Sequence, residues 1–205
     1  MCGFFGLHSH EFDKNDKIIA SKKSIEIQNH RGPDFNDFWL SENNEIILSH
    51  NRLSILDLSE TGNQPMFSRS GNLVIVFNGE IYNYRSVREE LEANGIGLRT
   101  SGDTEAILEG YRLWGEGVLD RIEGMYAFAL IDRQLGVGLV ARDPLGIKPL
   151  YFMRRGSTIA VASEMRPLQR FSVPKVNQYA LAELLTFGWA AGGLSNYDGI
   201  ERIAG

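Results

Sequence analysis

The first candidate for chemistry is Cys2, the single cysteine of the chain, which directly follows the initiator methionine. A small second residue permits removal of Met1, which would leave Cys2 with both a thiol and a free α-amine. The pKa of an α-amine is about 7.7–8.0. This amine can therefore accept the thiol proton without a histidine, as in nucleophile–base pairs at a chain terminus. A lone cysteine is more often a small buried residue of a strand, and Met-Cys-Gly alone favours that simpler interpretation.

A second candidate is the Asn78-Gly79 pair in the segment VFNGEIYNY. After an apolar strand, Asn-Gly is typical of a hairpin turn. Such a turn also presents the side-chain amide of Asn78 and the backbone N–H of Gly79 together. Two donors that converge on one point are what a tetrahedral oxyanion requires. Gly79 would also let the backbone approach a substrate closely, because it has no Cβ.

Two charged residues could bind the ends of an amino acid. Arg52 closes the apolar strand of HNRLSIL, where it is either a solvated strand end or a planar fork for an α-carboxylate. Asp103 in TSGDTE precedes a helix, so it is either an N-terminal cap or a carboxylate for an α-ammonium group. Each simpler interpretation is adequate when the residue is taken alone.

Short apolar runs of strand length recur between these residues, and most are bounded by Gly, Asn, Asp or Pro. They are CGFFGL near the start, EIILSH from Glu45, NLVIVF from Asn72, YAFALI from Tyr126, VGLVAR from Val137, PLYFMR from Pro149 and TIAVAS from Thr158. Periodicity predicts helices over 16–28, 84–94, 103–114 and 178–187, the second closed by Gly95. Strands interrupted by a few helices favour an α+β domain whose sheets are covered by helices. The spacing leaves the strand order open.

Composition excludes several classes of protein. The chain has 205 residues, 43% hydrophobic and 23% charged, with a net charge of −5, which fits one globular domain. Lys and Arg are scattered, so no nucleic-acid-binding face is expected. One cysteine allows no internal disulfide, and no apolar run reaches membrane-spanning length. The N-terminus lacks the pattern of a signal peptide, so we expect a cytoplasmic protein. The end of the chain still looks structured, so we expect more protein beyond Gly205.

Ordered motifs along the whole chain resemble those of the class II glutamine amidotransferase domain, in the version found in asparagine synthetase-like proteins. They are MCGFFG at 1–6, HRGPD at 30–34, HNRLSILD at 50–57, NQP at 63–65, FNGEIYNY at 77–84, SGDTE at 101–105, GMYAFALID at 124–132, RDPLGIKPLY at 142–151 and ASE at 162–164. The residues of the motifs HRGPD and NGEIYNY are similar to those of the asparagine synthetase branch of this family. The hexosamine-phosphate synthase and phosphoribosylamine-forming branches use different residues after HRG.

The resemblance implies the N-terminal nucleophile hydrolase fold, a four-layer αββα sandwich of two antiparallel sheets flanked by helices. It implies that Cys2 attacks the side-chain amide of L-glutamine and that Asn78 and Gly79 form the oxyanion hole. Arg52 would hold the substrate carboxylate and Asp103 its ammonium group. The pocket would be lined further by Glu80 and by the strand end, namely Leu53, Ser54, Ile55 and Leu56.

Other charged motifs are interpreted as architecture. Because the α-amine can serve as the base, no histidine is needed, and we expect HRGPD to tie loops together. We expect RDPLGIKPLY to support the site from behind through Arg142, Asp143 and Lys148. His8 and His10 lie in a polar stretch without the context of metal ligands, so no metal is assigned.

Residues 1–205 do not show which reaction would use the ammonia. In the resembling family a second domain activates a carboxylate with ATP and Mg²⁺ through an SGGxDS-type loop, and no such loop occurs in 1–205. We therefore expect a single amidotransferase domain that uses no cofactor itself. ATP and Mg²⁺ belong to a C-terminal synthetase domain of the same natural chain. The acceptor is left open between asparagine synthesis and another carboxylate, such as a sugar acid of surface polysaccharide. A homodimer is also left open.

Two other classes stay in view. One is a different terminal-nucleophile amidase, such as an acylase for an amide that is not an amino acid. Arg52 with Asp103 argues against it, because that pair suits an α-amino acid. The other is a non-catalytic domain that keeps the fold, and intact Cys2, Asn78, Gly79 and Asp103 argue against that.

Overall fold

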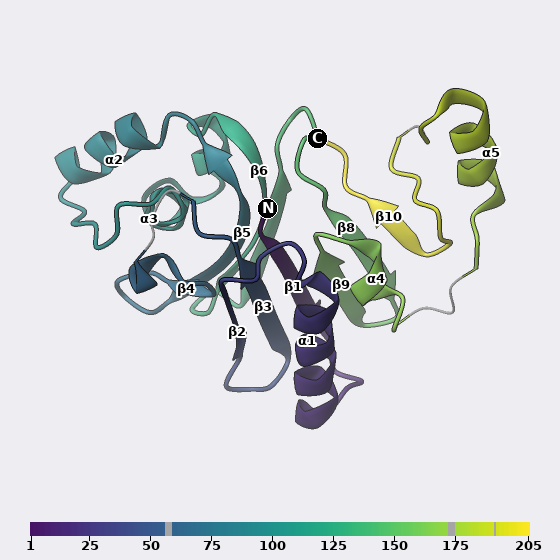
Figure 1. Ribbon diagram of the computed structural model, residues 1–205. Coiled ribbons are helices and arrows are strands. Elements are labelled where there is room, and N and C mark those ends of the chain that lie inside the picture. Colours follow the sequence, from purple (N-terminus) through teal and green to yellow (C-terminus); the bar gives the residue numbers. More distant parts are fainter. Residues whose placement is uncertain (56–58, 172–174, 191) are drawn as a thin grey trace.

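Two antiparallel sheets lie face to face with helices on their outer sides in the computed structural model (Figure 1), which describes residues 1–55, 59–171, 175–190 and 192–205. Within this part of the chain the first sheet has six strands. Their order is β10 (Ile200–Arg202), β8 (Tyr151–Arg155), β9 (Thr158–Ala162), β1 (Gly3–His8), β3 (Ile46–Arg52) and β2 (Phe35–Leu40). The second sheet has the order β4 (Met66–Phe67), β5 (Leu73–Ile81), β6 (Gly124–Asp132) and β7 (Val137–Arg142).

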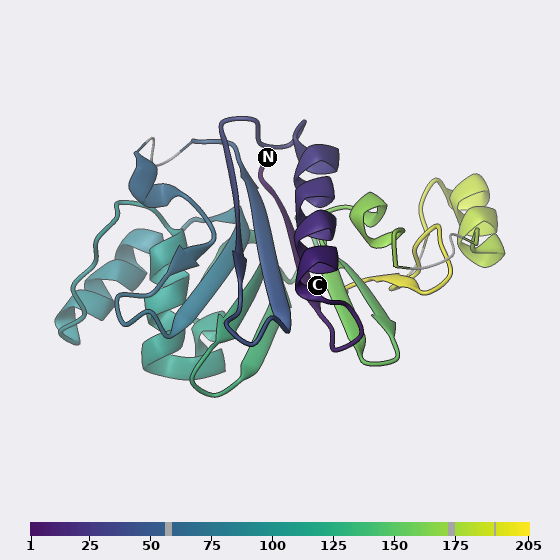
Figure 2. The same ribbon diagram turned by 90° about the horizontal axis from the view of Figure 1, so that it is seen from below.

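Each sheet has its own helices. α1 (Lys14–Gln28) and the short α4 (Met165–Leu168) pack on the first sheet, against β1, β3 and β9. α2 (Tyr84–Ala93) and α3 (Thr104–Trp114) cover the second sheet, where α3 contacts β5. Figure 2 shows this from below, with α1 on one side of the sandwich and the teal helices on the other. Two 3-10 helices span Glu60–Gly62 and Gly115–Asp120, and α5 (Gln178–Phe187) lies to the side of the sandwich (Figure 1).

Alternation along the strands produces the layers. Successive side chains of a strand point to opposite faces of its sheet. On β1, Phe4 packs in the cluster between the two sheets with Val76 and Leu48. Its neighbour Phe5 packs in the cluster beneath α1, with Ala20. A third buried cluster joins the outer face of the second sheet to α2 and α3. The predicted four-layer αββα sandwich is confirmed.

The four predicted helices form within two residues of their expected bounds, and α2 ends at Ala93 just before Gly95, whose φ is +79°. All seven apolar runs form strands. The prediction missed β2, β4 and β10. It was wrong about the turn at Asn78-Gly79, because β5 runs on to Ile81 and pairs Asn78 with Ala127 and Gly79 with Tyr126 of β6. The part of the chain that the structure describes contains no helix long and apolar enough to cross a membrane.

Candidate active site

A cavity of about 290 Å³ opens beside Cys2, where β1 begins. This volume is near the lower end of the roughly 300–1,000 Å³ typical of small-molecule sites, which suits a ligand the size of an amino acid. Its walls come from segments far apart in the sequence. They are Met1, Cys2, Arg52, Leu53, Ile55, Gly62, Gln64, Met66, Phe77, Asn78, Gly79, Glu80, Gly102, Asp103, Thr104, Met125 and Lys148.

Cys2 is held by hydrogen bonds from one residue just after β3 and one just after α1. The backbone N–H of Leu53 donates to its Sγ at 3.3 Å, and the thiol lies 3.6 Å from the Leu53 carbonyl oxygen. The Arg31 Nε donates to the Cys2 carbonyl oxygen at 2.9 Å. The thiol is thereby held at the wall of the cavity with its main chain anchored behind it.

Burial raises the pKa of the Cys2 thiol, and the Leu53 N–H and the charge of Arg52 oppose this shift only in part. The protonated thiol is therefore the resting form near neutral pH, whereas the thiolate is the nucleophile. A base must take the proton as the sulfur attacks. Among the described residues no histidine lines this cavity, so the α-amine that removal of Met1 would create on Cys2 is the candidate base.

Asn78 supplies a hydrogen-bond donor that the fold does not use. Its side chain is buried, and its Nδ2 has no hydrogen-bond partner among the described residues although it lies in the wall of the cavity. A buried unpaired amide costs about 1–3 kcal/mol. Such a cost at the wall of a cavity indicates a group kept for a ligand.

Gly79 is required by close packing of strands. A Cβ at this position would lie 2.4 Å from the Met125 carbonyl oxygen and 2.8 Å from the Tyr126 Cα. The backbone of β6 therefore leaves no room for a side chain at this position.

Two buried side chains that the sequence analysis overlooked hold the backbone next to Asn78. Gln64 Oε1 accepts a hydrogen bond from the Phe77 N–H at 2.6 Å. On the other side of the same residue, His50 Nε2 donates to the Phe77 carbonyl oxygen at 3.0 Å. The backbone of Phe77, just before Asn78, is thus held by β3 of the facing sheet and by the segment that leads into β4. Both residues stand in motifs quoted above, HNRLSILD and NQP, but no spacing in the sequence relates them to Asn78.

Opposite charges divide the wall of the cavity. Arg52 and Lys148 are cationic, and Glu80 and Asp103 are anionic. Arg52 Nη1 donates to the Ser59 carbonyl oxygen at 2.8 Å and to Asn63 Oδ1 at 2.7 Å, which fixes the plane of the guanidinium group. Two charges of each sign suit a zwitterion.

Asp103 does not cap α3 with its side chain. Its Oδ2 accepts a hydrogen bond from the Ile81 N–H at 2.9 Å, across the cavity wall. Burial raises the pKa of Asp103, and the Ile81 N–H opposes this shift. A carboxylate that is poorly solvated gains more from a cationic partner than an exposed one does.

The structure brings most of the predicted site residues to one place. Cys2, Arg52, Leu53, Ile55, Asn78, Gly79, Glu80 and Asp103 all line the cavity. Ser54 does not line it, because its N–H turns toward Asp34 Oδ2, at 2.8 Å. Leu56 lies outside the described residues.

The charged motifs behind the cavity act as supports. His30 and Arg31 both reach Glu164, at 2.8 and 3.3 Å, which ties the loop after α1 to the end of β9. Asp143 accepts hydrogen bonds from the backbone N–H groups of Tyr126, Ile147 and Lys148. Lys148 was expected behind the site, whereas the structure places it in the cavity wall itself.

An αββα sandwich of two antiparallel sheets, with Cys2 at the start of β1 in the wall of a cavity, is the arrangement of the N-terminal nucleophile hydrolase fold. The comparison with known families is more specific. The model of the glutamine amidotransferase domain matches residues 1–205, and the chain belongs to this family.

Curated relatives agree with this assignment. Asparagine synthetase [glutamine-hydrolyzing] 1 of Bacillus subtilis (strain 168) is 39% identical over 170 residues, which cover 82% of this chain and 26% of that protein. Asparagine synthetase B of Escherichia coli (strain K12) is 40% identical over 173 residues, which cover 82% of this chain and 30% of that protein. Amidase chry2 of Gibberella zeae is 28% identical over 99% of this chain and 31% of its own length. The chain thus spans roughly a quarter to a third of the length of these relatives.

Solved structures support the fold. The glutamine phosphoribosylpyrophosphate amidotransferase of B. subtilis superposes with a TM-score of 0.66 at 22% sequence identity, over 82% of this chain and 43% of that one. A structure described as the allosteric regulatory enzyme of purine biosynthesis gives a TM-score of 0.67, also at 22% identity.

Proposed function

We propose that this chain hydrolyses the side-chain amide of L-glutamine to glutamate and ammonia, with Cys2 as the nucleophile. The observation that carries the proposal is that Asn78, whose buried Nδ2 has no partner among the described residues, lines the same cavity as Cys2. A donor kept unpaired beside a nucleophile is suited to a charge that exists only during the reaction.

The chemistry proceeds as two acyl transfers. After removal of Met1, the α-amine of Cys2 takes the thiol proton while the sulfur attacks the amide carbon. Asn78 and Gly79 stabilise the oxyanion through Nδ2–H and N–H. The amine then returns the proton to the leaving nitrogen, which departs as ammonia and leaves a γ-glutamyl thioester. Water attacks the thioester with the α-amine as base again, and glutamate leaves as the thiol reforms.

The charges of the cavity wall support an α-amino acid as the substrate. The guanidinium of Arg52 would bind the α-carboxylate, since planar forks match carboxylates. Asp103 would bind the α-ammonium group, and the poor solvation of this carboxylate strengthens that ion pair. An acylase for simple amides would have no use for this pair.

We further propose that the ammonia passes to a synthetase domain of the same natural chain, which would use ATP and Mg²⁺ to activate a carboxylate. The support is the relatives, which are named asparagine synthetases and are three to four times as long as the matched region. The similar amidase of G. zeae favours other acceptors as the second candidate. A reaction that needs a reduced thiol is suited to the cytoplasm.

The test is glutaminase activity of the purified chain, with removal of Met1 checked by intact-mass spectrometry. We expect release of glutamate and ammonia from L-glutamine and none from the Cys2→Ala variant. Circular dichroism and thermal unfolding of this variant show whether the fold is kept. A thiol-reactive glutamine analogue should label Cys2, and excess L-glutamine should protect it. A processed, folded chain that neither hydrolyses glutamine nor reacts with the analogue would contradict the proposal.

A further inference from the structure

The motif His8-Ser9-His10 has no part in the proposed reaction, because it lies at the end of β1 opposite to Cys2. The sequence analysis assigned no metal to these histidines, since they lie in a polar stretch without the context of metal ligands. The structure supplies one. Glu45, the residue just before β3, lies beside them, and one ligand atom from each of His8, His10 and Glu45 falls within 4.8 Å of the others.

The loop that carries both histidines is tied to Glu45 through Ser9, which is fully buried. The Ser9 N–H donates to the Glu45 carbonyl oxygen at 3.0 Å. Its hydroxyl lies 2.7 Å from Thr158 Oγ1 and accepts the Glu11 N–H at 3.0 Å. The two imidazoles and the carboxylate therefore stand on backbone that is held together.

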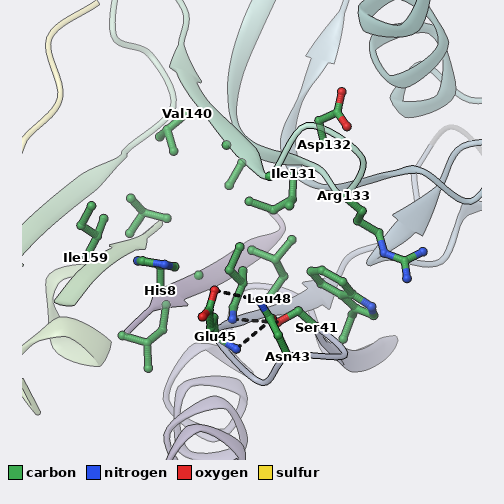
Figure 3. Close-up of a pocket in the computed structure, with 18 of the residues that line it drawn as sticks. His8, Ser41, Asn43, Glu45, Leu48, Ile131, Asp132, Arg133, Val140 and Ile159 are labelled. Atoms are coloured by element: carbon green, nitrogen blue, oxygen red, sulfur yellow. Dashed lines mark hydrogen bonds between the residues drawn. The ribbon is translucent and has the colours of Figure 1, made fainter. Parts of the chain in front are cut away.

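The carboxylate of Glu45 is oriented by the turn between β2 and β3. Asn43 Nδ2 donates to Glu45 Oε2 at 2.7 Å, while Asn43 Oδ1 accepts the Ser41 hydroxyl and the Glu45 N–H (Figure 3). The other carboxylate oxygen, Oε1, lies 3.3 Å from His10 Nδ1. The rings of His8 and His10 meet edge to face, with centroids 4.9 Å apart. A carboxylate fixed by an outer amide is the support that metal ligands require.

The ammonium group of Lys17 lies close enough to His8 and Glu45 to interact with them electrostatically, but its hydrogen bonds go to other residues. The Lys17 side chain is buried, and its ammonium donates to the carbonyl oxygens of Phe12 and Asn44 at 2.7 and 2.6 Å. Two strong acceptors thus occupy the ammonium, and the hydrogen bonds of Glu45 go to Asn43 and His10.

We propose that His8, His10 and Glu45 bind a divalent transition-metal ion of the zinc type. Imidazole and carboxylate together suit Zn²⁺ and its neighbours rather than Ca²⁺ or Mg²⁺. Ligand atoms of tetrahedral zinc lie about 3.4 Å apart, given bonds of about 2.1 Å. The side chain of His10 is 56% exposed, so it can turn to close the set. This site is independent of the proposed glutaminase reaction.

The ion would join two parts of the fold at the rim of a second cavity. His8 and Glu45 line this cavity of about 560 Å³, whose apolar wall includes Leu48, Ile131 and Val140 (Figure 3). A metal here ties the end of β1 to the β2–β3 turn. Binding to the folded state alone raises stability by mass action, so the thermal unfolding midpoint should rise with zinc concentration.

The test is a titration of the tag-free chain with Zn²⁺, followed by competition with a chromophoric chelator, and with Co²⁺, followed by visible absorption. Both use the Cys2→Ala background, because a thiolate would bind these ions by itself. We expect one ion per chain. Loss of a residue that only hydrogen-bonds a metal ligand costs about 10- to 100-fold in metal affinity. His8→Gln, His10→Gln and Glu45→Gln each remove a ligand itself, so each should weaken zinc binding by at least this factor.

The matched control is His30→Gln, which removes another exposed histidine paired with a glutamate, Glu164 at 2.8 Å. It should leave zinc affinity and the zinc-dependent rise in unfolding midpoint unchanged. Unfolding without metal separates a misfolded variant from one that has lost a ligand. Absence of stoichiometric binding, or binding that survives His10→Gln and Glu45→Gln, would overturn the proposal.

Discussion

His50 on β3 donates its Nε2–H to the carbonyl oxygen of Phe77 on β5, at 3.0 Å, and so joins the two sheets one residue before Asn78. A carbonyl oxygen only accepts, so the proton of the neutral ring is on Nε2. The other nitrogen, Nδ1, is buried without a partner among the described residues. The neutral imidazole of His50 therefore serves as a structural contact between the two sheets.

The first prediction concerns the pH dependence of stability. Burial lowers the pKa of His50 from 6.5 to about 4 in the folded chain. The stability that neutral His50 provides is fully present above pH 6.5 and is lost as the pH falls toward 4, because only the unfolded chain binds the proton there. Between pH 7 and 4.5 the free energy of unfolding should fall by roughly 2–3 kcal/mol more in the wild type than in His50→Gln. Urea unfolding at both pH values measures this, and equal losses would contradict a depressed pKa.

The second prediction separates activity from stability at Asn78. Loss of one oxyanion donor costs about 10²–10³ in kcat, so Asn78→Ala should lower kcat for glutamine by that factor with KM little changed. The unfolding midpoint should stay near that of the wild type, because the amide nitrogen that is removed has no hydrogen-bond partner among the described residues. Steady-state kinetics and thermal unfolding of the same sample provide the measurement. A large loss of stability with normal kcat would show that Asn78 is structural.

Local structure was largely predictable from the sequence. Helices such as 84–94 show clear periodicity, and buried strands such as β5 begin with a continuous apolar run, here LVIVF. β2 was missed because FNDFWL is an edge strand with exposed polar residues at Asn36 and Asp37, which weakens the strand pattern.

The site was predictable only through the family resemblance. Asn78-Gly79 resembles a hairpin turn locally, but nine paired positions between β5 and β6 carry the strand through it. Cys2 and Leu53 are in contact although they lie 51 residues apart in the sequence, and no local sequence pattern predicts such a contact. The hydrogen bonds of His50 and Gln64 to Phe77 and the position of Lys148 are likewise tertiary contacts that no local pattern encodes.

The third prediction tests the close approach at Gly79. In Gly79→Ala the added Cβ would meet backbone atoms of β6 at 2.4 and 2.8 Å, and backbone cannot move aside cheaply. Overpacking of this kind typically costs about 1–3 kcal/mol, so the unfolding midpoint should fall. Gly117→Ala is the control, because its Cβ would meet only Trp114 Cβ at 3.9 Å. Equal midpoints for the two variants would contradict this account of β5 and β6.

The fourth prediction concerns recognition of the α-ammonium group. Asp103→Asn keeps an oxygen for the Ile81 N–H but loses the charge. A hydrogen bond to a charged group is worth about 1.5–3 kcal/mol, so KM for L-glutamine should rise by roughly 10- to 100-fold. Glutaramate, which is glutamine without its α-amine, is the matched substrate, and its kcat/KM should be the same in wild type and variant. A comparable loss with both substrates would exclude a specific role for the charge.

The last prediction concerns Met1, which lines the same cavity as Cys2. While Met1 is attached, the nitrogen of Cys2 belongs to a peptide bond and cannot accept the thiol proton. The raised pKa of the thiol makes such a base necessary. General base catalysis contributes about 10²–10⁴ in rate, so chain from cells treated with a methionine aminopeptidase inhibitor should lose activity by at least about 100-fold. Treatment of that sample with the purified aminopeptidase should restore glutamate release in proportion to the processed fraction, measured by intact-mass spectrometry. Full activity with Met1 retained would show that another group takes the proton.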